Sequence, residues 1–351
     1  MNSRRDFFKK ATALGIGLFL FNKTAIADSQ KNSIIKPKAI NPGDTFGIIA
    51  PASGLFNAHQ TIIEAKEKIQ NLGFKVKIGK NIFKRKGYLA GSIKDRIEDL
   101  HNMFKDPEVK AIITIRGGYG SAQLLPYIDY NLIKKHPKIF VGYSDITSLL
   151  IGINKMTGLV TFHGPVAIST FTEYTKTYFL KTLESTTAIG EIEDAPYEDN
   201  LQTSNRVWTY KPGKAKGRLI GGNMTLLQAS MGTPYEFDTD GAILFLEEVG
   251  EEPYDIDRIL TQFKLAGKFD KCKGVVFGKI SNIQPATYKP AFNTTLSTEE
   301  IIENIFKDFD FPVCTGLSLG HIKHKPTLPI GIQAELDADR GKLKLLEPAV
   351  I

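Results

Sequence analysis

Cysteine is scarce in this chain, which holds only Cys272 and Cys314 among its 351 residues. Two cysteines cannot form a structural zinc site by themselves. Each lies at the edge of an expected strand, so the sequence leaves open whether the two pair in an oxidising compartment. The chain also has no cofactor-binding motif, no internal repeat and no low-complexity tract. We therefore expect no cofactor.

Basic residues form no stripe with interleaved aromatic residues, and this absence argues against a nucleic-acid partner. The formal net charge of +7 overstates the basicity, because the first 27 residues hold five basic residues and one acidic residue. Without them the net charge falls to about +3, which identifies no partner. Subtracting these 27 residues from 351 leaves 324, enough for two domains.

The N-terminus has the three-part layout of a secretory signal. Arg4 and Arg5 precede an apolar run over residues 11–21, and the small residues 25–27 follow. The apolar run is too short to span a bilayer comfortably, and no cysteine after it indicates a lipoprotein. We expect residues 1–27 to be a twin-arginine signal peptide cleaved after Ala27. This predicts a periplasmic protein with no stable membrane anchor, and an uncleaved anchor is the alternative.

Strands and helices alternate from residue 38 onward. The expected strands cover residues 45–50, 74–78, 109–115, 138–141 and 159–162, and the clearest helices cover 58–72 and 92–105. Such alternation predicts an α/β fold with a doubly wound parallel sheet, whose ligands bind at the carboxyl ends of the strands. Two glycine-rich turns lie at those ends, at residues 116–120 and 142–144.

The chain divides into two parts by composition. Residues 38–165 carry the alternating pattern, whereas residues 166–215 show weak periodicity and are interpreted as an interdomain connection. A second α/β domain is expected over residues 216–351. Its expected elements are strands at 242–246 and 274–280, helices at 256–265 and 297–307, and a hairpin of strands 330–336 and 342–346.

The turn Gly142-Tyr143-Ser144-Asp145 joins an apolar strand to an amphipathic helix. A serine in this position is lifted out of the sheet, and N–H groups at the helix start can stabilise an oxyanion. The pattern therefore favours a serine nucleophile. A plain helix N-cap is the alternative, and Ile146 breaks the G-x-S-x-G pattern of α/β-hydrolases.

A serine nucleophile needs a base and a group that orients the base. His163 and His321 both follow strand ends, and the sequence pattern does not decide between them. Glu247 and Glu248 end an apolar strand and supply a carboxylate, unless they belong to a solvated acidic loop. His321 and His324 have a metal-like spacing, but no helix holds them and no third ligand is evident, so we expect no metal. The other histidines are interpreted as surface residues: His59, His101 and His136.

Six short segments run in the same order as in one known family. They are IIAPAS at 48–53, RGGYG at 116–120 with Leu124, Leu125 and Asp129 after it, GYSDIT at 142–147, GGN at 221–223, LEE at 246–248 and GLSLGH at 316–321. In these segments the chain resembles the LD-carboxypeptidase family of serine peptidases. This family includes murein tetrapeptide carboxypeptidases and microcin C self-immunity peptidases.

The resemblance implies a catalytic triad. It assigns Ser144 as the nucleophile, His321 rather than His163 as the base, and Glu247 rather than Glu248 as the orienting carboxylate. It also implies a flavodoxin-like N-terminal domain followed by a smaller α/β C-terminal domain, with the triad at their junction. Members of the family are commonly homodimers and need no metal.

The expected reaction removes the terminal D-alanine from peptidoglycan tetrapeptide stems. The backbone N–H groups of Asp145 and Gly118 are expected to hold the oxyanion. Arg116 and the helix start near Ser121 are candidates for binding the carboxylate of the leaving group. Two alternatives remain: a related peptidase that cleaves peptidyl-nucleotide antibiotics, and a non-catalytic wall-binding protein on the same scaffold.

Overall fold

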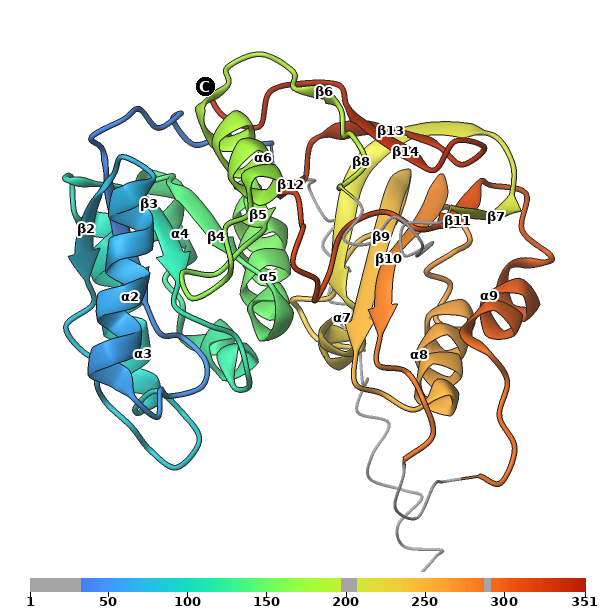
Figure 1. The fold of residues 1–351 in the computed structure, drawn as a ribbon, viewed down its shortest axis with the longest axis horizontal. Coiled ribbons are helices and arrows are strands. Elements are labelled where there is room, and N and C mark those ends of the chain that lie inside the picture. Colours follow the sequence, from blue (N-terminus) through green and yellow to red (C-terminus); the bar gives the residue numbers. More distant parts are fainter. Residues whose placement is uncertain (1–32, 197–206, 287–291) are drawn as a thin grey trace, which may run out of the picture. The chain divides into compact units, whose positions relative to one another are not determined.

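Five parallel strands make up most of the first sheet in the computed structural model, which describes residues 33–196, 207–286 and 292–351 (Figure 1). The strand order is β12-β5-β4-β3-β1-β2. The strands are β1 (Thr45–Ile49), β2 (Lys75–Ile78), β3 (Val109–Thr114), β4 (Ile139–Gly142), β5 (Thr161–His163) and the antiparallel β12 (Leu328–Ile330). The parallel order 2-1-3-4-5 is the flavodoxin-like order, so the predicted doubly wound sheet is confirmed.

Helices cover both faces of this sheet because neighbouring residues of a strand point to opposite sides. In β1, Gly47 faces Met103 of α3 (Ile93–Lys105), whereas Phe46 stacks on Phe179 of α6 (Glu173–Glu184). The remaining helices of this half are α2 (Ala58–Asn71), α4 (Tyr130–Lys135) and α5 (Thr147–Thr157).

The second sheet has eight strands in the order β6-β14-β13-β8-β9-β10-β11-β7. They are β6 (Gly190–Glu191), β7 (Trp208–Lys211), β8 (Lys214–Asn223), β9 (Ala242–Val249), β10 (Gly274–Ser281), β11 (Val313–Thr315), β13 (Gln333–Asp337) and β14 (Lys342–Leu345). Helices α7 (Met224–Ser230), α8 (Pro253–Leu265) and α9 (Thr298–Phe306) pack beside it (Figure 1). This sheet and its helices form the second α/β domain that the sequence predicts.

Two expectations about connections differ from the structure. The expected connection 166–215 contains α6, β6 and β7, and the last two are the edge strands of the second sheet. The expected strand 330–336 is interrupted, because β12 ends at Ile330 and pairs with β5 of the first sheet, whereas β13 begins at Gln333 in the second. The C-terminal segment therefore ties the two sheets together close to the end of β5.

The structure also bears on the cysteines and on membrane-spanning helices. Cys272 and Cys314 are both buried and neither forms a disulfide. None of the helices in the described ranges is long and apolar enough to cross a membrane. The expected signal peptide, residues 1–27, lies outside the described residues.

Candidate active site

Ser144 opens a short 3-10 helix, Ser144–Ile146, immediately after β4. Its φ of 63° lies in the left-handed region, which is unfavourable for a residue other than glycine by about 1–3 kcal/mol. The N-cap interpretation is wrong for this serine, because the N-cap of the following α5 is Ile146 and no side chain caps that helix. The strained turn instead directs the Ser144 hydroxyl toward His321.

His321 and Glu247 complete a chain of hydrogen bonds with this serine. The Nε2 atom of His321 lies 3.0 Å from Ser144 Oγ, and its Nδ1 lies 2.8 Å from Glu247 Oε2. The fully buried Glu247 carboxylate accepts a hydrogen bond from Nδ1–H, which leaves Nε2 free to accept the hydroxyl proton. The structure thus brings together the three side chains that the sequence analysis named.

The two adjacent glutamates point to opposite sides of β9, as alternation along a strand requires. Glu247 faces His321, whereas Glu248 accepts hydrogen bonds from Asn223 Nδ2 at 2.7 Å and from the N–H of Thr225 at 2.8 Å. Glu248 therefore stabilises the start of α7. Because both glutamates are buried, the solvated acidic loop is ruled out at these two positions.

Close approach at two glycines allows this geometry. A Cβ on Gly320, whose φ is 110°, would lie 3.0 Å from both Cβ and Oε2 of Glu247. A Cβ on Gly117 would lie 2.9 Å from Ser144 Cβ and 3.2 Å from Ser144 Oγ. A larger residue at either position would displace a triad side chain.

Asp145 fixes the glycine-rich loop beside the nucleophile. Its carboxylate accepts hydrogen bonds from the N–H groups of Gly120 at 3.2 Å and Ser121 at 2.8 Å. The Ser121 hydroxyl donates to the carbonyl of Asp145 at 2.5 Å. Ser121 is fully buried and does not line the cavity, and the expected role of the helix start near it in binding substrate stays a prediction. Its hydroxyl instead stabilises the turn through the hydrogen bond to the Asp145 carbonyl.

Arg96 of α3 is a positioning residue that the sequence analysis missed. Its guanidinium donates to the carbonyls of Pro51 at 2.9 Å and Gly120 at 2.8 Å, which joins the loops after β1 and β3. Ser53 adds a second link, because its hydroxyl accepts the N–H of Tyr119 at 3.0 Å. The sequence offered one signal for this role: Arg96 lies on the face of α3 that the amphipathic pattern predicts to be buried.

The triad opens into a cavity of about 530 Å³. Its lining comprises Arg116, Gly117, Gly118, Tyr143, Ser144, Val166, Ile168, Ser169, Thr170, His321, Ile322, Lys323 and Lys325. Arg116 and Gly118 thus face the space where a substrate would lie, but their expected roles stay predictions. The lining holds the basic side chains Arg116, Lys323 and Lys325, and no carboxylate among the described residues; Glu247 lies behind His321.

The other histidines have different surroundings. His163 is buried beside Phe245, and burial lowers its pKa to about 4. Its Nδ1 has no hydrogen-bond partner among the described residues, and His321 rather than His163 contacts Ser144. His324 lies 3.0 Å from the Thr172 hydroxyl, and His101 accepts the N–H of Asp129. The described ranges contain no group of three or more side chains suited to a metal ion.

Comparison with known proteins agrees with these motifs. Residues 46–164 match the LD-carboxypeptidase N-terminal domain, and residues 216–336 match the LD-carboxypeptidase C-terminal domain. A probable murein peptide carboxypeptidase of Bacillus subtilis is 39% identical over 310 residues, which cover 86% of this chain and 91% of that protein. The microcin C7 self-immunity protein MccF of Escherichia coli is 30% identical over 328 residues, covering 87% and 94%.

Solved structures show the same relationship. The crystal structure of a muramoyltetrapeptide carboxypeptidase from Oxalobacter formigenes superposes with a TM-score of 0.72 at 29% sequence identity. The match covers 86% of this chain and 97% of that one. The family matches, the long alignments and the shared fold establish that this chain belongs to the LD-carboxypeptidase family.

Proposed function

We propose that this chain is a serine LD-carboxypeptidase that removes the terminal D-alanine from peptidoglycan tetrapeptide stems. The observation that carries the proposal is the hydrogen-bonded chain from Ser144 through His321 to Glu247 at the wall of an open cavity. The names of the murein peptide and murein tetrapeptide carboxypeptidases among the relatives support this substrate.

The geometry supports a mechanism in two halves. His321 Nε2 takes the proton from Ser144 as Oγ attacks the scissile carbonyl, while Glu247 holds the imidazole tautomer and stabilises the imidazolium. The N–H groups of Asp145 and Gly118 hold the oxyanion of the tetrahedral intermediate. His321 then protonates the departing amine of D-alanine, and a water molecule hydrolyses the acyl-enzyme by the same route in reverse.

A second candidate is cleavage of a peptidyl-nucleotide antibiotic of the microcin C type. It is favoured by the relationship to MccF, which extends over 87% of this chain. The expected export signal favours the wall substrate, because an antibiotic that acts inside the cell is best inactivated there. A wall-binding protein without activity is disfavoured by the intact hydrogen-bonded triad.

We also propose periplasmic location through the twin-arginine route, and a homodimer. Murein tetrapeptide recycling is usually cytoplasmic, so an exported member would act on the sacculus or on its soluble fragments. Mass analysis of protein from the periplasm is expected to find a chain that begins at Asp28. Recovery of the chain only from the cytoplasm, beginning at Met1, would overturn the export proposal.

The decisive experiment for the activity uses the mature chain with purified muropeptides. We expect mass spectrometry to show conversion of tetrapeptide stems to tripeptide stems with release of D-alanine. A chelator is expected to leave the rate unchanged. Cleavage of a peptidyl-nucleotide but of no tetrapeptide would favour the second candidate, and loss of activity with chelator would contradict the serine mechanism.

A further inference from the structure

Lys325 is a cationic residue buried within the wall of the active-site cavity. It is only 7% exposed, yet it lines the same cavity as Ser144 and His321. Lysine is almost never fully buried without a partner, because removing an ammonium ion from water is unfavourable by several kcal/mol. Its position therefore requires an explanation.

Its surroundings in the described structure do not supply an anionic partner. The ammonium lies 4.2 Å from the centre of the Tyr143 ring, a cation–π contact. The same ring lies 4.9 Å from the ring of His321, so Lys325 is separated from the base by one aromatic side chain. No ion pair or hydrogen bond of the Lys325 ammonium is found among the described residues, and Glu247 acts on it only as a nearby charge.

Lys138, which is half-buried, shows how the same fold stabilises a lysine with a structural role. Lys138 stands just before β4, and its ammonium donates to the carbonyls of Met103 and Asp106. Burial lowers the pKa of both lysines to about 8. Lys138 is thus stabilised by backbone oxygens, whereas Lys325 lines the cavity and its ammonium contacts the Tyr143 ring.

We propose that Lys325 binds a carboxylate of the peptide substrate, in a subsite beside the Tyr143 ring. The inference rests on the proposed carboxypeptidase function and adds a specificity residue to it. An entering carboxylate would supply the partner that the described residues lack, and a charge-assisted hydrogen bond to a mostly buried ammonium is strong. The bound anion would also favour the charged form of a lysine whose pKa burial has lowered.

Two carboxylates of a stem peptide have the required chemistry. Every tetrapeptide stem ends in the carboxylate of D-alanine, next to the scissile bond. A meso-diaminopimelate stem has a second carboxylate at the end of its side chain, which a lysine stem lacks. Arg116 and Lys323 also line the cavity, so Lys325 need bind only one of these two groups.

The test compares the wild-type protein with Lys325→Met and Lys325→Arg on four tetrapeptides. The peptides combine a diaminopimelate or lysine third residue with a terminal carboxylate or carboxamide. We expect Lys325→Met to raise KM about 30-fold or more for the peptide whose carboxylate binds there, with a smaller change in kcat. Lys325→Arg is expected to retain most of the affinity because it keeps the charge.

The substrate preference that Lys325→Met loses identifies the carboxylate that Lys325 binds. If Lys325 binds the D-alanine carboxylate, the variant loses the preference for acid over amide. If it binds the side chain, the variant loses the preference for diaminopimelate over lysine. Either result supports the proposal, and unchanged values of both ratios would overturn it. Absence of D-alanine release by the wild-type protein from all four peptides would instead contradict the proposed function.

A stability measurement provides a readout that does not depend on turnover. Removal of a buried cation without a partner is expected to leave the melting temperature unchanged or higher in Lys325→Met. The matched control, Lys138→Met, removes two hydrogen bonds and is expected to lower it while leaving substrate preference intact. A melting temperature of Lys325→Met as low as that of the control would mean that Lys325 has a structural partner, and would contradict the proposal.

Discussion

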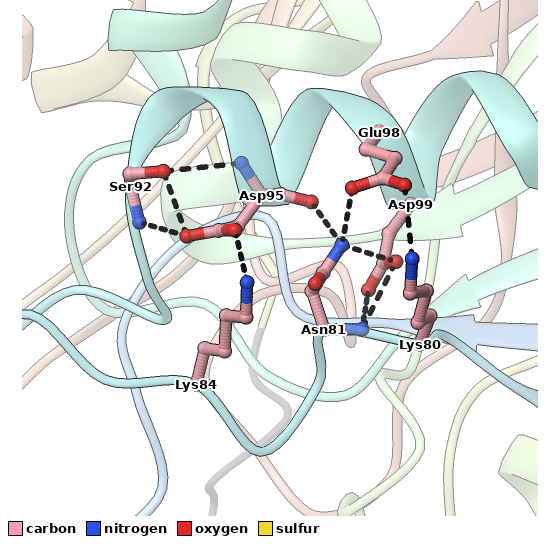
Figure 2. A network of polar contacts seen from close by, with 7 residues as sticks. All are labelled: Lys80, Asn81, Lys84, Ser92, Asp95, Glu98 and Asp99. Carbon is pink, nitrogen blue, oxygen red and sulfur yellow. Dashed lines mark hydrogen bonds and ion pairs between the residues drawn. The ribbon is translucent and has the colours of Figure 1, made fainter.

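Two polar clusters of this molecule differ in how completely their groups are paired. On α3, Asp95 accepts bonds from the N–H and hydroxyl of Ser92 and contacts Lys84, whereas the amide of Asn81 bonds Asp99 and Glu98 (Figure 2). In the active-site region, Glu247 Oε1 and His163 Nδ1 have no hydrogen-bond partner among the described residues.

The difference separates a structural cluster from a reactive one. Paired groups gain nothing further from a ligand, so the cluster of Figure 2 holds the loop after β2 against α3. Unpaired buried groups are unfavourable for folding and persist where a site uses them. The two regions are also linked, since α3 contributes Arg96 to the loop beside Ser144.

Loss of the nucleophile should have the largest effect on the reactive cluster. We expect Ser144→Ala to lower kcat by about 10⁴- to 10⁶-fold, because in the proposed mechanism the hydroxyl oxygen forms the acyl-enzyme. Removing a strained serine should not lower the melting temperature by much. The matched control is Ser148→Ala in α5, which is expected to keep nearly full activity. Full activity of Ser144→Ala in the muropeptide assay would refute the covalent mechanism.

Substitution of the two neighbouring glutamates of β9 compares a reactive carboxylate, Glu247, with a structural one, Glu248. Glu247→Gln should lower kcat on the order of 10³- to 10⁴-fold with little loss of stability, because His321 loses the partner that fixes its tautomer. Glu248→Gln should keep most of the activity and lower the free energy of unfolding by about 1–2 kcal/mol, through weaker bonds to Asn223 and Thr225. Kinetics and denaturant unfolding of both variants measure this, and the reverse ranking would contradict the assigned roles.

A smaller effect is expected where the backbone approaches the nucleophile. The added methyl group of Gly117→Ala would meet Ser144 and the N–H of Asp145 at 3.2 Å or less. Displacement of the hydroxyl or of the oxyanion site by a fraction of an ångström should lower kcat by about 10- to 100-fold. Unchanged kcat at normal stability would show that the loop adapts without affecting the triad.

The sequence predicted local features well and distant pairings poorly. The turn 142–145 and the capping box opened by Ser297 are encoded in consecutive residues, and both have the expected form. The sequence pattern alone could not choose His321 over His163, because the choice depends on how the loop after β11 reaches β4. The resemblance supplied that choice.

The missed elements have a common physical cause. The helix α6 has weak amphipathic character and lies in a segment rich in threonine and tyrosine, so its periodicity gave little signal. The strand β12 has only three residues and depends on pairing with β5, more than 160 residues earlier in the chain, as the register Ile330 to Thr161 shows. Ser121, Arg96 and Lys325 likewise owe their roles to neighbours that are distant in sequence.

The last prediction concerns the stability of the paired cluster, rather than the reaction rate, and its dependence on pH. Asp99 is buried, and this burial raises its pKa to about 6 despite hydrogen bonds from Asn81. The folded protein therefore holds a proton at Asp99 that the unfolded chain releases nearer pH 4, so this group should make stability fall as pH rises from about 4 to about 6.

Two variants with opposite expected signs test this dependence. Asp99→Asn removes the titration while its amide oxygen still accepts from Asn81, so its stability relative to wild type should rise by on the order of 1–3 kcal/mol between about pH 4 and pH 6. The matched control is Glu98→Gln on the same helix. The hydrogen bond from Asn81 lowers the pKa of Glu98, so the wild-type carboxylate stabilises the fold above its unfolded pKa and loses that contribution as the pH falls. Denaturant unfolding at both pH values measures each difference. If Asp99→Asn follows the control, the carboxylate of Asp99 is stabilised rather than destabilised by its surroundings, and Asp99 and Glu98 play the same role.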